Sequence, residues 1–84
     1  MQLKVVYLAR LRDAFGRGSE ELELAAPATV EMVVDRLRAR GGAWAHELAQ
    51  GRAVRIAVNQ EMVAGAVVLN DGDEVALLPP VTGG

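Results

Sequence analysis

The strongest constraint on the fold of this chain is one amphipathic helix that has strand patterns on both sides of it. Thr29 is a favourable N-cap for the helix, and the glycine pair at residues 41–42 is expected to end it. Its apolar residues recur at the spacing of a buried helical stripe: Val30, Val33, Val34 and Leu37. A chain of 84 residues is large enough for only one core. The helix is therefore expected to pack on a face of the sheet that the strands form.

Strand patterns occupy both ends of the chain. The first, at residues 2–7, alternates apolar and polar side chains and places Leu3, Val5 and Tyr7 on its buried face. The other strands are expected at residues 21–24, 54–58, 67–69 and 74–78.

The order of these segments indicates the fold class. Short helical segments are expected at residues 9–15 and 43–50, each followed by glycine. Because the main helix crosses between two groups of strands, the strands are expected to form a mixed sheet with this helix on one face. The sequence therefore predicts an α+β fold of the β-grasp, ubiquitin-like type, with about five strands, one main helix and short extra helices.

The chain ends in a segment that differs from the rest. The domain is expected to occupy residues 1–78 and an extended tail residues 79–84, which read Pro79-Pro80-Val81-Thr82-Gly83-Gly84. Proline favours an extended chain, and glycine, which has no Cβ, can enter a channel too narrow for other residues. At roughly 3.3 Å per residue the tail reaches about 20 Å. Such a terminus suggests that the α-carboxylate of Gly84 is the reactive group, although a frayed tail without a role explains the tail alone equally well.

Composition removes most kinds of catalytic site. The chain has no cysteine, which excludes a disulfide scaffold, a cysteine nucleophile and thiolate metal ligands. His46 is the only histidine and has no partners for a nucleophilic triad. Acidic residues gather at residues 71–74, but Asp-Gly-Asp-Glu is ordinary turn composition. Trp44 is expected to fill the core, and no metal site, bound cofactor or catalysis by the chain alone is expected.

Charge and hydropathy limit the kinds of partner that the chain can bind. The net charge is −2 and no run of Lys or Arg occurs, which argues against nucleic-acid binding. No apolar stretch approaches the roughly 18 residues that a membrane span needs. The strand pattern starts at once, so no signal peptide is expected. A cytoplasmic protein is therefore predicted.

Two leucines point to a docking surface. Strand parity places Leu8 and Leu78 on the outward face of the sheet, each at the end of its strand. If the first and last strands are neighbours, these side chains form an apolar patch at the root of the tail. Single exposed leucines are common, but a patch beside a reactive terminus is better explained as a partner-binding surface.

These residues resemble a known family. The segment from residue 71 to residue 84, DGDEVALLPPVTGG, looks like the C-terminal segment of the MoaD family, the small subunit of molybdopterin synthase. Residues 5–12 and 57–61 also resemble that family, so the likeness covers essentially the whole chain. The related thiamin-pathway carriers, ThiS, share the fold and the Gly-Gly end. They are usually shorter and lack the helical segment at residues 9–15, which favours MoaD.

The resemblance implies a sulfur carrier. In the family an ATP-dependent, MoeB-like activating enzyme adenylates the terminal glycine, and sulfur then replaces AMP to give a thiocarboxylate. The tail enters a MoaE-like large subunit, where the sulfur is donated to a pterin precursor. By this likeness Gly84 carries the acyl-adenylate and the thiocarboxylate, and Gly83 gives the slimness needed for entry. Leu8 and Leu78 match positions where the family often has aromatic residues, so the packing of the docking surface is expected to differ.

Other functions remain open at this point. The same tail would serve a sulfur carrier of another pathway, such as a thiamin-type carrier. It would also serve a ubiquitin-like modifier that forms isopeptide bonds with target lysines. A third alternative is a plain binding module with an inert tail.

Overall fold

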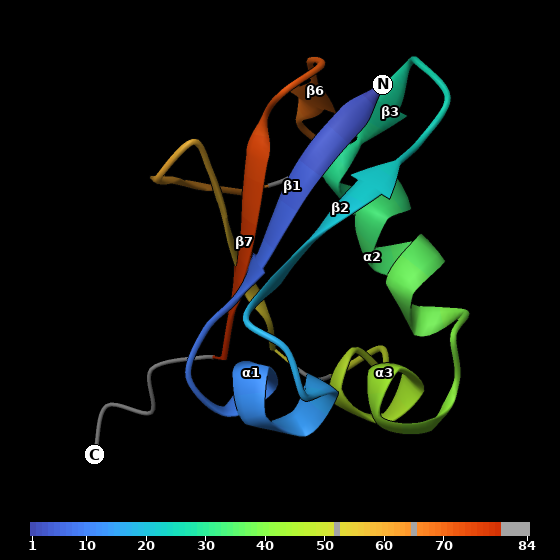
Figure 1. The fold of residues 1–84 in the computed structure, drawn as a ribbon, viewed down its shortest axis with the longest axis vertical. Helices are drawn as coiled ribbons and strands as arrows, with labels where there is room; N and C mark the ends of the chain where they lie inside the picture. Colours follow the sequence, from blue (N-terminus) through green and yellow to red (C-terminus); the bar gives the residue numbers. More distant parts are fainter. Residues whose placement is uncertain (52, 65, 80–84) are drawn as a thin grey trace.

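A five-stranded mixed sheet forms one layer of the molecule, in the order β2-β1-β7-β4-β5 (Figure 1). The computed structural model describes residues 1–51, 53–64 and 66–79. The strands are β1 (Gln2–Tyr7), β2 (Ser19–Glu23), β4 (Arg55–Val58), β5 (Glu61–Val63) and β7 (Glu74–Leu78). β1 is parallel to β7 and antiparallel to β2, whereas β4 is antiparallel to both β7 and β5. The predicted mixed sheet and β-grasp class are confirmed.

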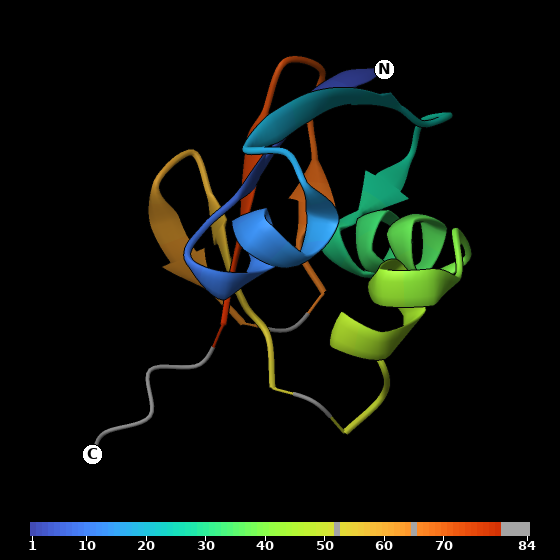
Figure 2. The same cartoon turned by 60° about the horizontal axis from the view of Figure 1, so that its bottom comes forward.

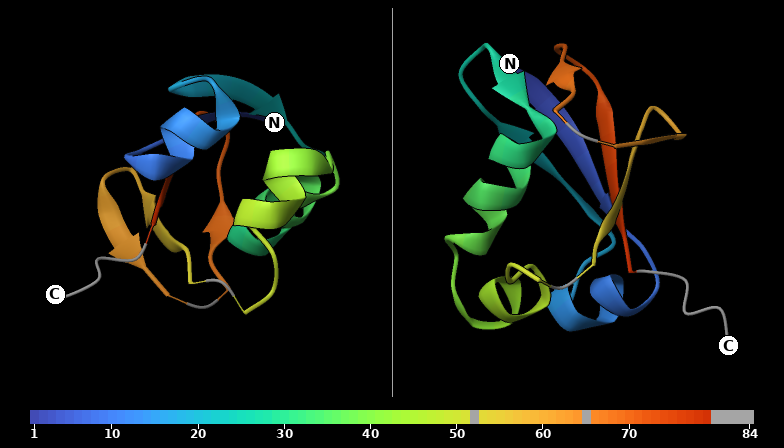
Figure 3. Two further views of the ribbon diagram at one scale, coloured as in Figure 1. Left: turned by 90° about the horizontal axis from the view of Figure 1, so that it is seen from below. Right: turned by 180° about the vertical axis from the view of Figure 1, so that it is seen from behind.

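The second layer is helix α2, Val30–Arg38, which crosses one face of the sheet (Figure 3). Thr29 Oγ1 accepts a hydrogen bond from the backbone N–H of Met32 at 3.3 Å, which confirms the predicted N-cap. Three residues of the predicted stripe are fully buried and Val34 is half-buried. The helix ends at Arg38, earlier than the predicted glycine pair, and Gly42 instead begins the next helix.

The core lies between these two layers. Its fully buried side chains come from both layers and from three segments outside them, at Leu11, Leu48 and Leu69. The largest of those in the two layers are Tyr7, Leu3, Leu37, Leu77, Val5, Val33 and Val75. The alternation predicted for β1 is therefore confirmed, and Val75 and Leu77 of β7 are buried in the same core. In the described part of the chain, no helix is long and apolar enough to cross a membrane.

One predicted strand lies outside the main sheet. Val68–Leu69 forms β6, which pairs antiparallel with β3, Ala28–Thr29, in a separate two-stranded sheet. The backbone N–H of Val30 donates to Val67 at 3.1 Å, so this segment is tied to the start of α2. Its expected place in the main sheet is taken by β5, which the sequence does not predict.

Two short helices lie side by side at the end of the sheet where β1 and β7 end (Figures 1 and 2). α1 spans Arg10–Phe15 and ends at Gly16, whose φ of 71° is the left-handed conformation that glycine favours. α3 spans Gly42–Glu47 and is shorter than predicted. Both predicted helices are thus present, with different bounds.

A cluster of aromatic and charged side chains connects α1 and α3 to β1, β2 and the loop after α2. Phe15 and Trp44 stack with ring centroids 3.9 Å apart, and Tyr7 meets both rings edge-on at 5.1 and 5.3 Å. The Tyr7 hydroxyl donates to Glu20 Oε2 at 2.5 Å. Arg40 donates to both Glu20 carboxylate oxygens at 2.8 Å, and its guanidinium lies 4.5 Å from the Trp44 ring centroid. Trp44 is therefore more than core filler, because it also supports an ion pair.

This arrangement sets the charge states of the cluster. The hydrogen bonds from Arg40 hold the pKa of Glu20 below its ordinary value of 4.5, with further contributions from Tyr7 and Arg17. Burial and the neighbouring carboxylate raise the pKa of Tyr7 above its usual range. Glu20 is therefore ionised and Tyr7 is neutral at physiological pH. In these states the hydrogen bonds of Glu20 to Tyr7 and Arg40 connect β2 to β1 and to the loop after α2.

We predict that Glu20→Gln lowers the free energy of unfolding at pH 7 by about 1–3 kcal/mol, because Arg40 loses its bidentate partner. The pKa of Glu20 is lower in the folded chain than in the unfolded chain. Its stabilising effect is therefore complete above pH 4.5 and is lost as the pH falls toward the folded-state value. Urea titrations between pH 3 and pH 7, roughly the range of carboxylate titration, should show a smaller acid-induced loss in Glu20→Gln.

Glu23→Gln on the same strand is the matched control, since Glu23 is exposed and its side chain makes no ion pair or hydrogen bond within the described residues. Equal pH profiles of Glu20→Gln and the wild type would contradict the role of the cluster.

Candidate functional site

The first and last strands are neighbours, as the predicted docking patch requires. The backbone N–H of Leu8 donates to Leu77 at 3.1 Å, directly beyond the β1–β7 ladder. This places Leu8 and Leu78 side by side on the face of the sheet opposite α2. Leu8 is 39% exposed, whereas Leu78 is half-buried and not fully exposed as the sequence predicts.

The apolar area extends further than these two leucines. Val6, Ala76, Ala57 and Met62 are successive cross-strand partners in one row from β1 to β5. The alanines are only 6% and 7% exposed, because larger neighbours cover small side chains. Ala76 therefore belongs to the outward row although its small side chain is almost completely covered. Met62 is 55% exposed at the edge of the row. We call these residues, with Leu8 and Leu78, the outer apolar surface.

Sequence reasoning missed Met62 because it missed β5. The signal was present in Asn59 and Gln60, whose φ values of 50° and 70° are those of a tight hairpin turn. The Asn59 side chain accepts from the Glu74 backbone N–H and donates to Asp73, each at 3.0 Å. The hairpin that presents Met62 is thereby held against the start of β7.

The acidic turn at residues 70–73 has a structural role. Asp71 Oδ1 accepts from the Gln2 backbone N–H at 2.7 Å, and Asp73 Oδ2 accepts from the Asn70 N–H at 2.8 Å. The latter bond and the Asn59 amide hold the pKa of Asp73 below its usual range. Within residues 1–51, 53–64 and 66–79, no group of His, Asp and Glu is placed to hold a metal ion. His46 is exposed on α3.

The turn after Leu8 is strained. Ala9 has φ 52° and ψ −129°, a conformation that glycine adopts freely and alanine rarely does. The Leu8 carbonyl accepts from the Leu11 N–H at 3.1 Å, which closes the turn and starts α1. The strain therefore lies directly beside the exposed Leu8, where the chain changes from strand to helix.

Charge is unevenly distributed on this face. Lys4, the only lysine of the chain, pairs in register with Glu21 on β2 and Glu74 on β7. Arg55 lies opposite Leu78, at the end of the sheet where β7 ends. The outer apolar surface thus has a mixed, mainly acidic border at one end and an arginine at the other.

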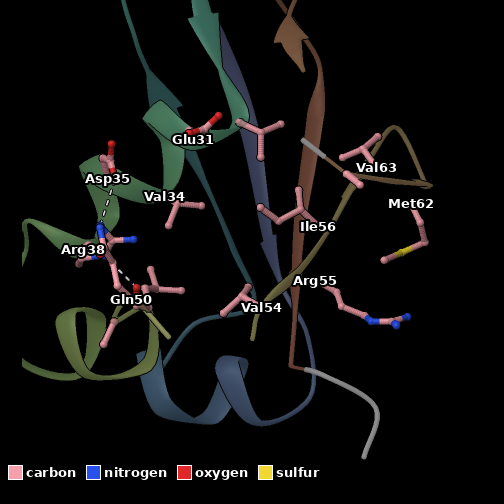
Figure 4. A pocket seen from close by; sticks show the side chains of 14 residues that line it. Glu31, Val34, Asp35, Arg38, Gln50, Val54, Arg55, Ile56, Met62 and Val63 are labelled. Atoms are coloured by element: carbon pink, nitrogen blue, oxygen red, sulfur yellow. Dashed lines mark hydrogen bonds and ion pairs between the residues drawn. The ribbon is translucent and has the colours of Figure 1, made fainter. Parts of the chain in front are cut away.

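A cavity of about 860 Å³ lies on the opposite face, between α2 and the β4–β5 hairpin (Figure 4). Val34, Ile56 and Val63 are among its apolar lining residues, and Glu31 and Asp35 lie on its helical side. Arg38 donates to Asp35 at 3.1 Å and to Leu48 at 2.8 Å within this wall. Arg55 and Met62 also line it, whereas the predicted docking residues Leu8 and Leu78 do not.

Pro79 is the part of the predicted tail that the structure describes. β7 ends at Leu78, and Pro79 is the last described residue. Pro80, Val81, Thr82, Gly83 and Gly84 lie outside the described residues, so the tail and the role of Gly84 stay predictions.

Solved structures place the chain in a class of small β-grasp proteins. The Haloferax volcanii HVO 2177 protein is similar with a TM-score of 0.85 and 32% identity, covering 100% of this chain and 87% of that one. The putative molybdopterin converting factor subunit 1 of Pyrococcus furiosus is similar with a TM-score of 0.78 and 33% identity, over 96% and 99% of the two chains.

The chain belongs to the ThiS family, whose model matches residues 5–84. A curated relative, the molybdopterin synthase sulfur carrier subunit of Escherichia coli, is 40% identical over 82 residues, which cover 98% of this chain and 99% of the relative. The resemblance predicted from the C-terminal segment is therefore confirmed.

We predict that Ala9→Gly raises the free energy of unfolding by about 1 kcal/mol. Relief of the strained turn should exceed the entropy that glycine adds to the unfolded chain. Ala14→Gly inside α1 is the control and should destabilise by about 0.5–1 kcal/mol. Thermal and urea unfolding measure both changes, and a destabilised Ala9→Gly would show that this turn carries no strain.

Proposed function

We propose that this protein is the sulfur carrier subunit of molybdopterin synthase and that Gly84 bears the sulfur. The observation that carries the proposal is its likeness, over almost its full length, to a relative of that name, within a family match that runs to Gly84. The outer apolar surface at the end of β7 supports it, because a docking area is needed beside a tail that works in another protein.

The chemistry requires an activated terminus. A carboxylate is a poor electrophile until one of its oxygens becomes part of a good leaving group. A MoeB-like enzyme would transfer AMP from ATP to the Gly84 carboxylate with release of pyrophosphate. A sulfur nucleophile would then attack the acyl carbon, and AMP would leave. When the nucleophile is hydrosulfide, the product is directly the thiocarboxylate, which is the form that gives up sulfur. When it is a persulfide, the product is an acyl disulfide, and a thiol must reduce its S–S bond to release the thiocarboxylate.

The chain would not catalyse this reaction alone. A MoaE-like large subunit would cover the outer apolar surface and receive the tail, where the sulfur passes to the pterin precursor. Leu8 and Leu78 would contact it at the tail root and Met62 at the far side of the surface. Both partners and the carrier are proposed to act in the cytoplasm.

A conjugating modifier remains the second candidate, because it would use the same activated carboxylate. Proteomic analysis of cell extract for lysines that bear the Thr82-Gly83-Gly84 remnant distinguishes the two functions. A sulfur carrier predicts no such lysines. The thiamin pathway is tested by complementation. If this chain restores growth of a strain that lacks its own thiamin-type carrier, and does not restore molybdopterin synthesis in a strain that lacks its own molybdopterin sulfur carrier, the chain belongs to the thiamin pathway.

We predict that incubation with the cognate activating enzyme, ATP and a sulfur donor exchanges one oxygen of Gly84 for sulfur. Intact-protein mass spectrometry and fragmentation of the terminal peptide measure the exchange. A chain that lacks Gly84 should keep the fold and lose sulfur transfer completely, whereas an inert tail predicts unchanged function. An unchanged mass with an activating enzyme of proven activity would rule out the carrier function.

We predict that Leu78→Asp weakens binding to the large subunit at least about 30-fold, because it places a charge within a desolvated contact. Leu78 faces away from the core, so the melting temperature should change little. Val68→Asp, at an exposed residue of β6, is the matched control and should leave binding unchanged. Calorimetry measures binding, and a large loss of stability in Leu78→Asp would show that this side chain belongs to the core.

A further inference from the structure

Arg55 is a charged residue within an apolar neighbourhood. It is exposed, and its Cα lies opposite that of Leu78 in the β4–β7 register. Strand parity puts it on the same face as Ala57, and therefore diagonal to Met62 on β5. Arg55 is also among the residues that line the cavity, at its rim, and Figure 4 shows its guanidinium extending away from α2. Arg55 is thus flanked by an exposed or half-buried apolar residue on each neighbouring strand.

The described part of the chain supplies no carboxylate to Arg55. The arginines that form ion pairs with carboxylates in this part of the chain are Arg10, Arg17, Arg38 and Arg40. On the outward face, Glu21 and Glu74 lie beside Lys4 at the other end of the sheet. A strand rises about 3.3 Å per residue, so Glu74 and Leu78 are about 13 Å apart along β7.

A partner that contacts both Leu78 and Met62 must also cover Arg55, which lies between them. Water would then be removed from the guanidinium. A charge that loses its water is costly unless the partner supplies an opposite charge and hydrogen-bond acceptors. An arginine at this position therefore demands a specific chemistry from the surface that docks on it.

We propose that Arg55 is a specificity-determining residue that binds a carboxylate on the large synthase subunit. The inference rests on the proposed function, because it concerns the partner that this function assigns to the outer apolar surface. The apolar residues provide most of the contact area. The arginine selects a partner whose complementary surface carries an Asp or Glu opposite the end of β4.

Arginine suits this position better than lysine for two reasons. Its planar guanidinium can donate to both oxygens of one carboxylate, which fixes the orientation of the partner. The delocalised guanidinium is also a much poorer nucleophile than an amine. A lysine amine beside the tail root could attack the activated carboxyl of Gly84, forming an amide with loss of AMP. Arg55 provides charge there without that side reaction.

The test uses the full-length chain and the purified cognate large subunit. Arg55→Gln should raise the Kd at least about 30-fold at low salt, because the partner carboxylate is left without its charged donor. The ratio of the Kd of Arg55→Gln to that of the wild type should become smaller as the salt concentration rises, because salt screens the charge pair. Arg55→Lys should recover part of the affinity, since it keeps the charge. Arg36→Gln, at an exposed residue of α2, is the matched control and should bind as the wild type does.

Carbodiimide cross-linking identifies the carboxylate directly. The reagent activates a carboxyl group, and a nearby amine displaces the urea to form an amide. With the Arg55→Lys variant bound, we expect a link between the new amine and an acidic residue of the large subunit, mapped by peptide mass spectrometry. Arg36→Lys should give no link to that residue.

The outcomes separate the two claims. An Arg55→Gln variant that binds within about twofold of the wild type overturns the inference, as does the absence of the expected link in the bound Arg55→Lys complex. In both cases the proposed function stands. A wild-type chain that does not bind the large subunit at all overturns the proposed function and this inference with it.

Discussion

The parallel pairing of β1 with β7 joins the first and last strands of the chain at the centre of the sheet. Parallel neighbours need a long crossover, and everything between residues 8 and 73 supplies it, including α2. Because the two strands run the same way, they end together. Leu8 and Leu78 therefore meet at one end of the sheet, where the chain leaves β7. The position of the outer apolar surface follows directly from this one pairing.

Two kinds of interaction keep that end of the sheet in place. The cluster of Tyr7, Glu20 and Arg40 holds β1 to β2 and to the loop after α2, with Trp44 beneath the guanidinium. The strained turn at Ala9 directs the chain from β1 into α1 without covering Leu8. A partly buried ionic cluster thus lies close to a strained and exposed turn. A surface that must present a tail to other proteins needs both a rigid base and uncovered side chains.

The sequence predicts the elements whose side chains alternate strictly, and fails where packing decides. Strands β1 and β7 and helix α2 have a clear apolar face, so their burial follows from periodicity. β5 was missed because its apolar Met62 points outward, which removes the alternation. The partner of β6 depends on the path of the chain around α2 and not on its own residues. Arg55 resembles any solvent-facing strand residue until the register shows Leu78 beside it.

The position of Lys4 has a consequence for any linkage between copies of this protein. It is the only side-chain amine in the chain and lies near the start of β7, whereas the tail leaves from the end of that strand. If the terminus of one copy were joined to a side-chain amine of another, every junction would involve Lys4. Each copy would accept one neighbour by this route. Such a polymer would be unbranched. Because Lys4 and the tail lie at opposite ends of β7, consecutive junctions would be separated by about the length of one sheet.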